Sequence, residues 1–262
     1  MKRKLKIGIF KLSSCDGCQT VLMDLPSLWD LCEVAYWLLG ADTKDPPRVE
    51  IAFVEGSVST PEEEEFLKKV REKAEVLVSI GACATSGGIQ ALRNFMTEED
   101  YLRIYPEPEH LRILSRSLPA GEVVPVDYEI YGCPINPKLF ENFVVSYLYN
   151  KKPRIPDHPL CMECKLRGNI CVMDAYGIPC LGPVVRAGCG ALCPAVGRGC
   201  YGCFGPCRNP NLKSLTDWFE HLGVSREEIV GMFRNENAYA PEFRRLLEEG
   251  LEGGQNKPAD AG

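Results

Sequence analysis

The fourteen cysteines of this 262-residue chain are its most reactive side chains, and nine of them lie within residues 161–207. Thiolates are ligands for soft metals and for iron–sulfur clusters. Disulfide scaffolds with this many cysteines are usually short secreted chains, whereas an apolar content of 45% provides a core without such staples. Many closely spaced cysteines in a reducing compartment therefore predict metal sites or catalysis.

The overall composition excludes several classes of protein. A formal net charge of -6 argues against nucleic-acid binding, which needs a basic surface. No apolar stretch approaches the ~20 residues that span a bilayer. Residues 1–10 are basic and then apolar, but they run into Cys15 without a cleavage site, so they predict a first strand rather than a signal peptide. We expect a cytoplasmic protein with no membrane span.

Residues 1–150 show strands alternating with helices. The predicted strands cover residues 5–12, 49–54, 76–80 and a run that ends at 131, and the predicted helices cover 61–71 and 137–150. Thr60 is a good N-cap for the first of these helices, with Pro61 at the first helical position. This alternation predicts an α/β fold, a flavodoxin-like doubly wound parallel sheet with helices on both faces.

Four cysteines of this half each follow the carboxyl end of a predicted strand. They are Cys15, Cys18, Cys83 and Cys133. Open α/β sheets bind their ligands at that edge, so three separate loops are expected to bring four thiolates together. Four thiolates are the ligand set of a [4Fe–4S] cluster, and neighbouring glycines let the backbone offer N–H groups to the cluster sulfurs.

Two other ligands are less compatible with these loops. Structural zinc usually binds pairs of cysteines that bracket short hairpins, whereas these thiolates come from three distant loops. A phosphate site at residues 81–88 lacks the Gly-Lys-Ser/Thr of a P-loop, and no GxGxxG follows the first strand. Zinc remains an alternative, and a nucleotide site has no motif to support it.

Residues 151–262 follow a different pattern. A proline-rich linker at 151–159 precedes nine cysteines that are separated by glycines and prolines with little periodicity. Such a segment buries little apolar surface, so its order must come from metal, and eight of the nine thiolates make two further four-thiolate sites. Helical patterns return at 214–219 and 226–232, and the small, polar tail from Gly253 is predicted to be disordered.

The order of these motifs resembles that of the small subunit of [NiFe] hydrogenases. The matching motifs are Ser14-Cys-Asp-Gly-Cys18, Val54-Glu-Gly-Ser57, Gly81-Ala-Cys83 with Gly87-Gly88, Tyr131-Gly-Cys-Pro134, and the cysteine run from Cys161-Met-Glu-Cys164 to Cys200-Tyr-Gly-Cys203. The resemblance covers residues 5 to about 245 and is strongest to the cytoplasmic, NAD(P)-linked type, the sulfhydrogenase delta subunits. The related complex I subunit typically has adjacent cysteines in the first motif, whereas Asp16 and Gly17 separate them here.

The resemblance implies three sets of cluster ligands. The proximal cluster, nearest the NiFe centre, would use Cys15, Cys18, Cys83 and Cys133. The distal cluster would use Cys161, Cys164, Cys171 and Cys180, and the medial cluster would use Cys189, Cys193, Cys200 and Cys203. Periplasmic members usually have a histidine in place of Cys161 and a proline in place of one medial ligand. Thiolates at both positions imply three [4Fe–4S] clusters with low potentials.

Three residues stay outside these ligand sets. Cys32 is expected to be a buried, apolar side chain. Cys207 is an alternative to Cys193 as a ligand, because crowded cysteine spacings do not fix connectivity. Glu55 ends a buried strand at the same sheet edge. It would serve either as a proton or hydrogen-bonding group near the proximal cluster, or as a partner of a helix N-terminus or of another subunit.

The resemblance also implies an electron relay rather than a site of hydrogen cleavage. The Ni–Fe ligands would lie on a separate large subunit, and an FAD-containing partner with ferredoxin-like subunits would exchange electrons with NAD(P). Residues 1–150 would hold the proximal cluster, and residues 151–262 the other two. The alternatives are a cluster subunit of an F420- or heterodisulfide-reductase-linked hydrogenase or of a quinone-type redox complex, and a zinc-stabilised interaction module.

Overall fold

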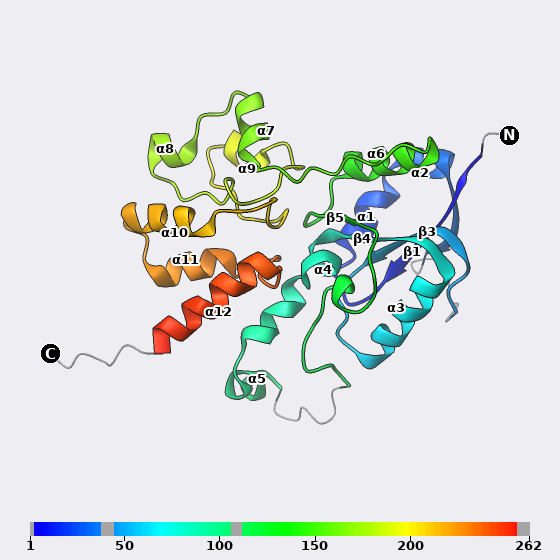
Figure 1. Cartoon of the computed structure of the whole chain (residues 1–262), viewed down its shortest axis with the longest axis horizontal. Helices are drawn as coiled ribbons and strands as arrows, with labels where there is room; N and C mark the ends of the chain where they lie inside the picture. The colour runs from blue at the N-terminus through cyan, green and yellow to red at the C-terminus, as the bar shows by residue number, and fades with distance from the viewer. Residues whose placement is uncertain (1–2, 38–44, 106–111, 256–262) are drawn as a thin grey trace. The chain divides into compact units, whose positions relative to one another are not determined.

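The computed structural model describes residues 3–37, 45–105 and 112–255 (Figure 1). The chain divides into two compact units, residues 1–156 and residues 157–262. Among the helices in the described ranges, none is long and apolar enough to cross a bilayer.

The first unit is built on one five-stranded parallel sheet. Its strands are β1 (Leu5–Lys11), β2 (Cys32–Trp37), β3 (Val49–Glu55), β4 (Ala74–Ile80) and β5 (Tyr128–Ile130). Their spatial order is β2-β1-β3-β4-β5, and every neighbouring pair runs parallel. This is the flavodoxin-like order, so the predicted α/β, doubly wound fold is confirmed.

Helices connect these strands and cover the sheet (Figure 1). They are α1 (Gly17–Met23), α2 (Pro26–Leu31), α3 (Pro61–Lys73), α4 (Gly81–Ser86), α5 (Glu98–Ile104) and α6 (Pro137–Leu148), with 3₁₀ segments η2 (Ile89–Phe95) and η4 (Ala120–Glu122). The helices predicted at 61–71 and 137–150 are confirmed as α3 and α6.

Side chains of the central strand β3 alternate between the two faces of the sheet. The ring centroid of Phe53 lies 4.5 Å from that of Phe140 and 5.9 Å from that of Phe143, both on α6. Val54 belongs to a separate core cluster that includes Leu67 of α3. Because helices cover both faces, β3 is apolar along nearly its whole length, and its carboxyl end points at the loops that carry cysteines.

The sequence pattern does not reveal strand β2. Its first residue, Cys32, follows the last residue of α2, Leu31, without a turn between them. The strand lies at the edge of the sheet, and its side chains have mixed exposure rather than regular alternation. The strand predicted at the end of the run that reaches residue 131 is present as β5, which stops at Ile130.

Helix α3 begins with a capping box. Thr60 Oγ1 accepts a hydrogen bond from the Glu63 N–H at 3.1 Å, and Glu63 Oε2 accepts one from the Thr60 N–H at 3.1 Å. Ser13 Oγ donates to Glu63 Oε1 at 2.8 Å. The start of α3 therefore also holds the loop that leads to Cys15.

The second unit combines short helices among the cysteines with three longer helices. Its helices are α7 (Cys161–Leu166), α8 (Val172–Tyr176), α9 (Leu192–Ala195), α10 (Leu212–His221), α11 (Arg226–Phe233) and α12 (Pro241–Gln255). Phe219, Phe233 and Phe243, one from each longer helix, are fully buried. These aromatic side chains form an apolar core in the part of the unit that follows the cysteines.

Two predictions about this unit have different outcomes. The helical patterns at 214–219 and 226–232 are confirmed as parts of α10 and α11. The predicted disorder from Gly253 is wrong for residues 253–255, because α12 continues to Gln255. The rest of the predicted tail, residues 256–262, lies outside the described residues.

We expect Thr60→Ala to lower the free energy of unfolding by about 1 kcal/mol, because the substitution removes the side-chain acceptor of the capping box. Urea denaturation followed by circular dichroism measures this change. Thr60→Ser keeps the hydroxyl and is the control, which should unfold close to the wild type. Equal losses in the two variants would show that the hydroxyl is not what stabilises the start of α3.

Candidate metal centres

Three loops at the carboxyl edge of the sheet carry the first four cysteines. Cys15 lies between β1 and α1, and Cys18 lies in the first turn of α1. Cys83 lies in α4, which begins directly after β4. Cys133 follows the end of β5. Because the strands are parallel, these loops meet at one edge.

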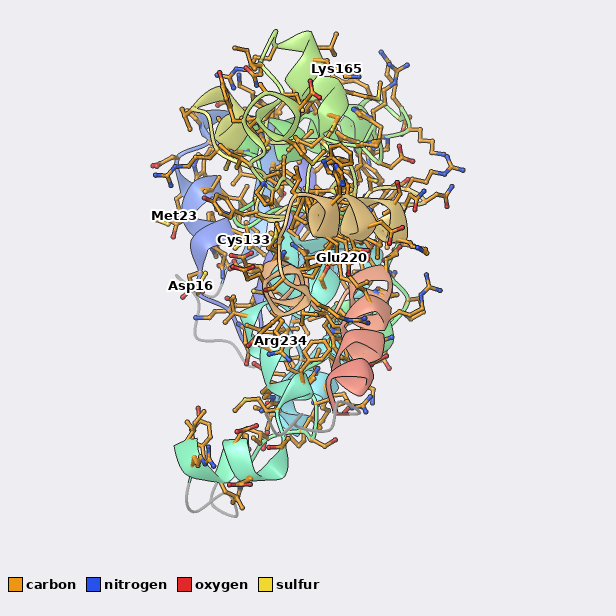
Figure 2. The ribbon with its side chains drawn as sticks, turned by 90° about the vertical axis from the view of Figure 1, so that its left-hand side faces the viewer. Asp16, Met23, Cys133, Lys165, Glu220 and Arg234 are labelled. Carbon is orange, nitrogen blue, oxygen red and sulfur yellow. The ribbon has the colours of Figure 1, made fainter. Side chains whose placement is uncertain are left out.

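The four thiols of these loops act on one another electrostatically. As a thiolate, Cys18 is repelled by Cys83 and Cys133, and Cys83 is repelled by Cys133 and Cys15. Cys18 is buried and Cys83 half-buried, whereas Cys15 and Cys133 are exposed. Figure 2 shows Cys133 on the same side of the ribbon as Asp16, which lies between the first two cysteines in the sequence. The group is thus buried on one side and open on the other.

Burial disfavours free thiolates in this group. Desolvation, followed by the charge of Glu55, raises the pKa of Cys18, while the N–H of Ile135 opposes the shift by hydrogen bonding to the sulfur. Desolvation, followed by repulsion from Cys133 and Cys15, raises the pKa of Cys83 to about 12. A metal would displace these protons, since a coordinated thiol is deprotonated.

Glycines keep the space beside two of the sulfurs free. Gly81 and Gly88 have φ angles of +79° and +66°. A Cβ at Gly81 would stand 2.4 Å from Cys18 Sγ, and a Cβ at Gly88 would stand 2.5 Å from Cys83 Sγ. A side chain at either position would force the sulfur to move. Thiols are the donors that an iron–sulfur cluster requires, and glycines beside two of them let the backbone come close to the cluster.

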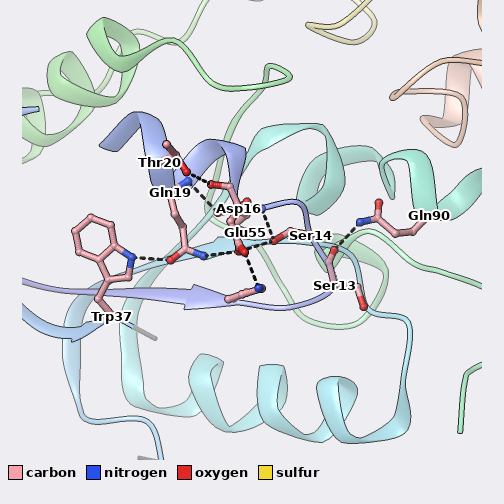
Figure 3. A network of polar contacts seen from close by, with 9 residues as sticks. Ser13, Ser14, Asp16, Gln19, Thr20, Trp37, Glu55 and Gln90 are labelled. Atoms are coloured by element: carbon pink, nitrogen blue, oxygen red, sulfur yellow. Dashed lines mark hydrogen bonds and ion pairs between the residues drawn. The ribbon is translucent and has the colours of Figure 1, made fainter. Parts of the chain in front are cut away.

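The buried carboxylate of Glu55 holds the first turn of α1 (Figure 3). Its Oε2 accepts the Gln19 N–H at 3.0 Å, and the side chains of Ser14 and Gln19 also hydrogen-bond to it. Trp37 Nε1 donates to Gln19 Oε1 at 2.6 Å. Burial raises the pKa of Glu55. Glu55 therefore acts as a helix N-terminal partner, one of the roles considered for it, while the N-cap residue Asp16 makes no side-chain cap bond.

In the second unit, Cys161, Cys164, Cys171 and Cys180 form one group. Cys161 and Cys164 lie on α7, and Cys171 immediately precedes α8. Desolvation, followed by repulsion from Cys180, Cys164 and Cys171, raises the pKa of Cys161 to about 11. The charges of the other three cysteines therefore act on the thiol of Cys161.

Cys189, Cys193, Cys200 and Cys203 form an adjacent group. Desolvation raises the pKa of Cys200, and repulsion from Cys180, Cys203 and Cys189 adds to the shift. Burial also raises the pKa of Cys189, with a smaller contribution from Cys193. The Cys200 N–H donates to Cys180 Sγ at 3.1 Å, so the two groups of the second unit are in contact.

The two remaining cysteines are also buried. Cys32 begins β2 and belongs to the hydrophobic core, as predicted. Cys207 Sγ donates to the Pro183 carbonyl oxygen at 3.8 Å, and the charges that act on its thiol include those of Arg186 and Glu242. Cys207 is thus engaged with backbone and ionic groups.

The three groups are defined by these electrostatic effects between thiols and by the topology of the chain. Within residues 3–37, 45–105 and 112–255, no three His, Cys, Asp or Glu side chains are arranged to hold a single metal ion.

Two carboxamide side chains contact cysteine sulfurs and have no signal in the sequence. Gln90 hydrogen-bonds to the sulfur of Cys83. Asn169 Nδ2 donates to Cys164 Sγ at 3.7 Å. Asparagine and glutamine are common on protein surfaces and no spacing marks these two, so only the folded chain identifies them.

Comparisons with known proteins identify the family of the chain. A family described as NADH ubiquinone oxidoreductase, 20 Kd subunit, matches residues 15–147. The chain is 33% identical over 234 residues to sulfhydrogenase 2 subunit delta of Pyrococcus furiosus, covering 88% of this chain and 98% of that protein. It is 31% identical over 240 residues to an F420-non-reducing hydrogenase subunit of Methanococcus voltae, covering 78% of this chain and 83% of that protein.

Solved structures give the same result. A chain of an NAD+-reducing [NiFe]-hydrogenase in the H2-reduced state is 30% identical with a TM-score of 0.52, covering 59% of this chain and 96% of that one. A chain of the actinobacterial-type NiFe-hydrogenase from Ralstonia eutropha H16, 18% identical, shares the fold with a TM-score of 0.55 over 98% of this chain and 92% of that one. The chain therefore belongs to the family of the NADH ubiquinone oxidoreductase 20 kDa subunit and, within it, to the small subunits of [NiFe] hydrogenases.

Proposed function

We propose that this subunit relays electrons through three [4Fe–4S] clusters between the NiFe site of a large subunit and a flavin-containing partner that uses NAD(P). The observation that supports this most strongly is that twelve cysteines at the sheet edge and in the second unit act on one another's pKa values, with the Cys200 N–H also bonded to Cys180 Sγ. Each group offers the full ligand set of a cubane cluster.

The proximal cluster is assigned to Cys15, Cys18, Cys83 and Cys133. The distal cluster is assigned to Cys161, Cys164, Cys171 and Cys180, and the medial cluster to Cys189, Cys193, Cys200 and Cys203. Cys193 is preferred to Cys207, because Cys193 acts on the thiol of Cys189, whereas Cys207 bonds to the Pro183 carbonyl.

The clusters would supply one-electron transfer, and the chain would control where and at what potential it occurs. Exposed Cys15 and Cys133 leave one side of the proximal group open to a large subunit. Burial of Cys18 and Cys200 lowers the local dielectric and keeps water away. All-cysteinate ligation adds negative charge, which favours the low potentials needed for exchange with NAD(P).

The partners and the compartment follow from the same proposal. A large subunit would hold the NiFe centre, and subunits with FAD and ferredoxin-like clusters would complete the path in the cytoplasm. The relative from Methanococcus voltae belongs to a hydrogenase named as F420-non-reducing, and this supports an alternative acceptor, such as a heterodisulfide-reductase-linked partner.

We expect the anaerobically purified protein to contain about 12 iron and about 12 acid-labile sulfide per chain, the content of three four-iron clusters. Iron, zinc and sulfide analysis, together with electron paramagnetic resonance (EPR) of the reduced form, measures this. Stoichiometric zinc with negligible sulfide would contradict the relay and leave a zinc-stabilised interaction module.

Cys83→Ser should reduce the iron content to about 8 per chain, because only the proximal cluster depends on this thiolate. Hydrogen-dependent NAD(P) reduction by the purified complex should be lost, since electrons could no longer enter the relay. Cys32→Ala is the matched control, and it should retain all the iron. Full activity in Cys83→Ser would remove Cys83 from the ligand set.

The contacts of Cys207 predict a different outcome for a second pair of variants. Cys193→Ser should lose iron from the medial cluster, whereas Cys207→Ser should keep the wild-type iron content and EPR spectrum. Iron analysis of the two proteins, prepared side by side, decides between them. Iron loss confined to Cys207→Ser would exchange the roles of the two cysteines.

A further inference from the structure

We propose that two side-chain amides, those of Gln90 and Asn169, set the reduction potentials of the proximal and distal clusters by donating N–H hydrogen bonds to one ligand sulfur each. The inference rests on the proposed relay and adds to it the residues that control its first and last steps. Neither amide is a metal ligand, and each acts through a cysteine.

The position of Gln90 is fixed by contacts with two cysteine-bearing loops. Its Nε2 donates to the Ser13 carbonyl oxygen at 2.9 Å, in the loop before Cys15 (Figure 3). Because a carbonyl only accepts, this contact determines which end of the amide carries the hydrogens. The Gln90 side chain also acts on Cys83, whose pKa its hydrogen bond to the sulfur lowers.

The close packing around Gly88 keeps the Gln90 amide in this place. A Cβ at Gly88 would stand 2.5 Å from Gln90 Oε1 and 2.5 Å from Cys83 Sγ, so the amide and the sulfur pack against the same point of the backbone. Gln90 Oε1 is buried and has no hydrogen-bond partner among the described residues. An unpaired buried carbonyl is costly, so the contacts of Nε2 must compensate for it.

Asn169 reaches its sulfur through the turn that ends α7. Gly168 adopts the left-handed conformation, with φ +74°, and reverses the chain after the helix. The Asn169 N–H then donates to the Cys164 carbonyl oxygen at 3.1 Å, and its side-chain Nδ2 lies 3.7 Å from Cys164 Sγ. The backbone and the side chain of Asn169 therefore both bind Cys164.

The direction of the effect follows from charge. Reduction adds one electron to a cluster, and the added negative charge is shared with the ligand sulfurs. An N–H dipole aimed at a sulfur stabilises the reduced form more than the oxidised form and so raises the potential. The effect is stronger where water is excluded, and Gln90 and Asn169 are both half-buried, so we expect each contact to shift the potential of its own cluster.

The test is a redox titration, followed by EPR, of the complete hydrogenase complex carrying Gln90→Leu or Asn169→Leu. The signals are assigned by their loss in Cys83→Ser and Cys164→Ser. Gln90→Leu should shift only the proximal midpoint potential to more negative values, and Asn169→Leu should shift only the distal one, so each variant is the control for the other. Gln90→Glu and Asn169→Asp keep the shape of the side chain but replace the donor by a negative charge, and they should shift the same midpoint further.

The outcomes separate this inference from the proposed relay. A wild-type protein without iron and sulfide would overturn both. A full iron content with unmoved midpoints in the leucine and the acidic variants would overturn only the tuning role. If a leucine variant loses iron, the corresponding acidic variant decides between the two roles. A shifted midpoint potential in the acidic variant supports tuning. Iron loss in the acidic variant as well would assign the amide a purely structural role and overturn the inference.

Discussion

The burial of several thiolates beside one another is the physical constraint on which both units depend. Each thiolate loses hydration when it is buried and repels its neighbours, so the thiols of Cys18, Cys83 and Cys161 hold their protons well above neutral pH. Cationic iron removes both penalties at once. The cysteine groups are thus stable as ligands and unfavourable as free thiolates, and the surrounding backbone is shaped around that requirement.

The two units meet this constraint in different ways. In the first unit the parallel sheet positions the loops, and side chains from other strands and helices hold the loop of the first cysteine pair. Glu63 contacts it through Ser13, Glu55 through Gln19, and Gln90 through the Ser13 carbonyl. In the second unit the cysteines lie on short helices and turns, and apolar side chains between them, such as Leu181, Val184 and Val185, are buried.

This difference between the two units is compatible with an electron relay. A rigid first site keeps its geometry when one side faces another subunit, as the exposure of Cys15 and Cys133 allows. In the second unit, the contact between the Cys200 N–H and Cys180 Sγ joins two groups directly, which shortens the path between their centres. In the proposed relay, hydrogen bonds to sulfur would let the chain adjust potentials without changing the ligands.

The sequence by itself determined the element types of the first unit, because a strand buried on both faces must be apolar throughout and because proline and threonine mark the start of α3. It also determined which cysteines follow strand ends. Only the tertiary structure decided that β2 is an edge strand, that Glu55 binds the start of α1, and that Gln90 and Asn169 reach sulfurs. The physical reason is distance along the chain: the Glu55–Gln19 and Gln90–Ser13 bonds join residues 36 and 77 positions apart, and no local pattern encodes such contacts.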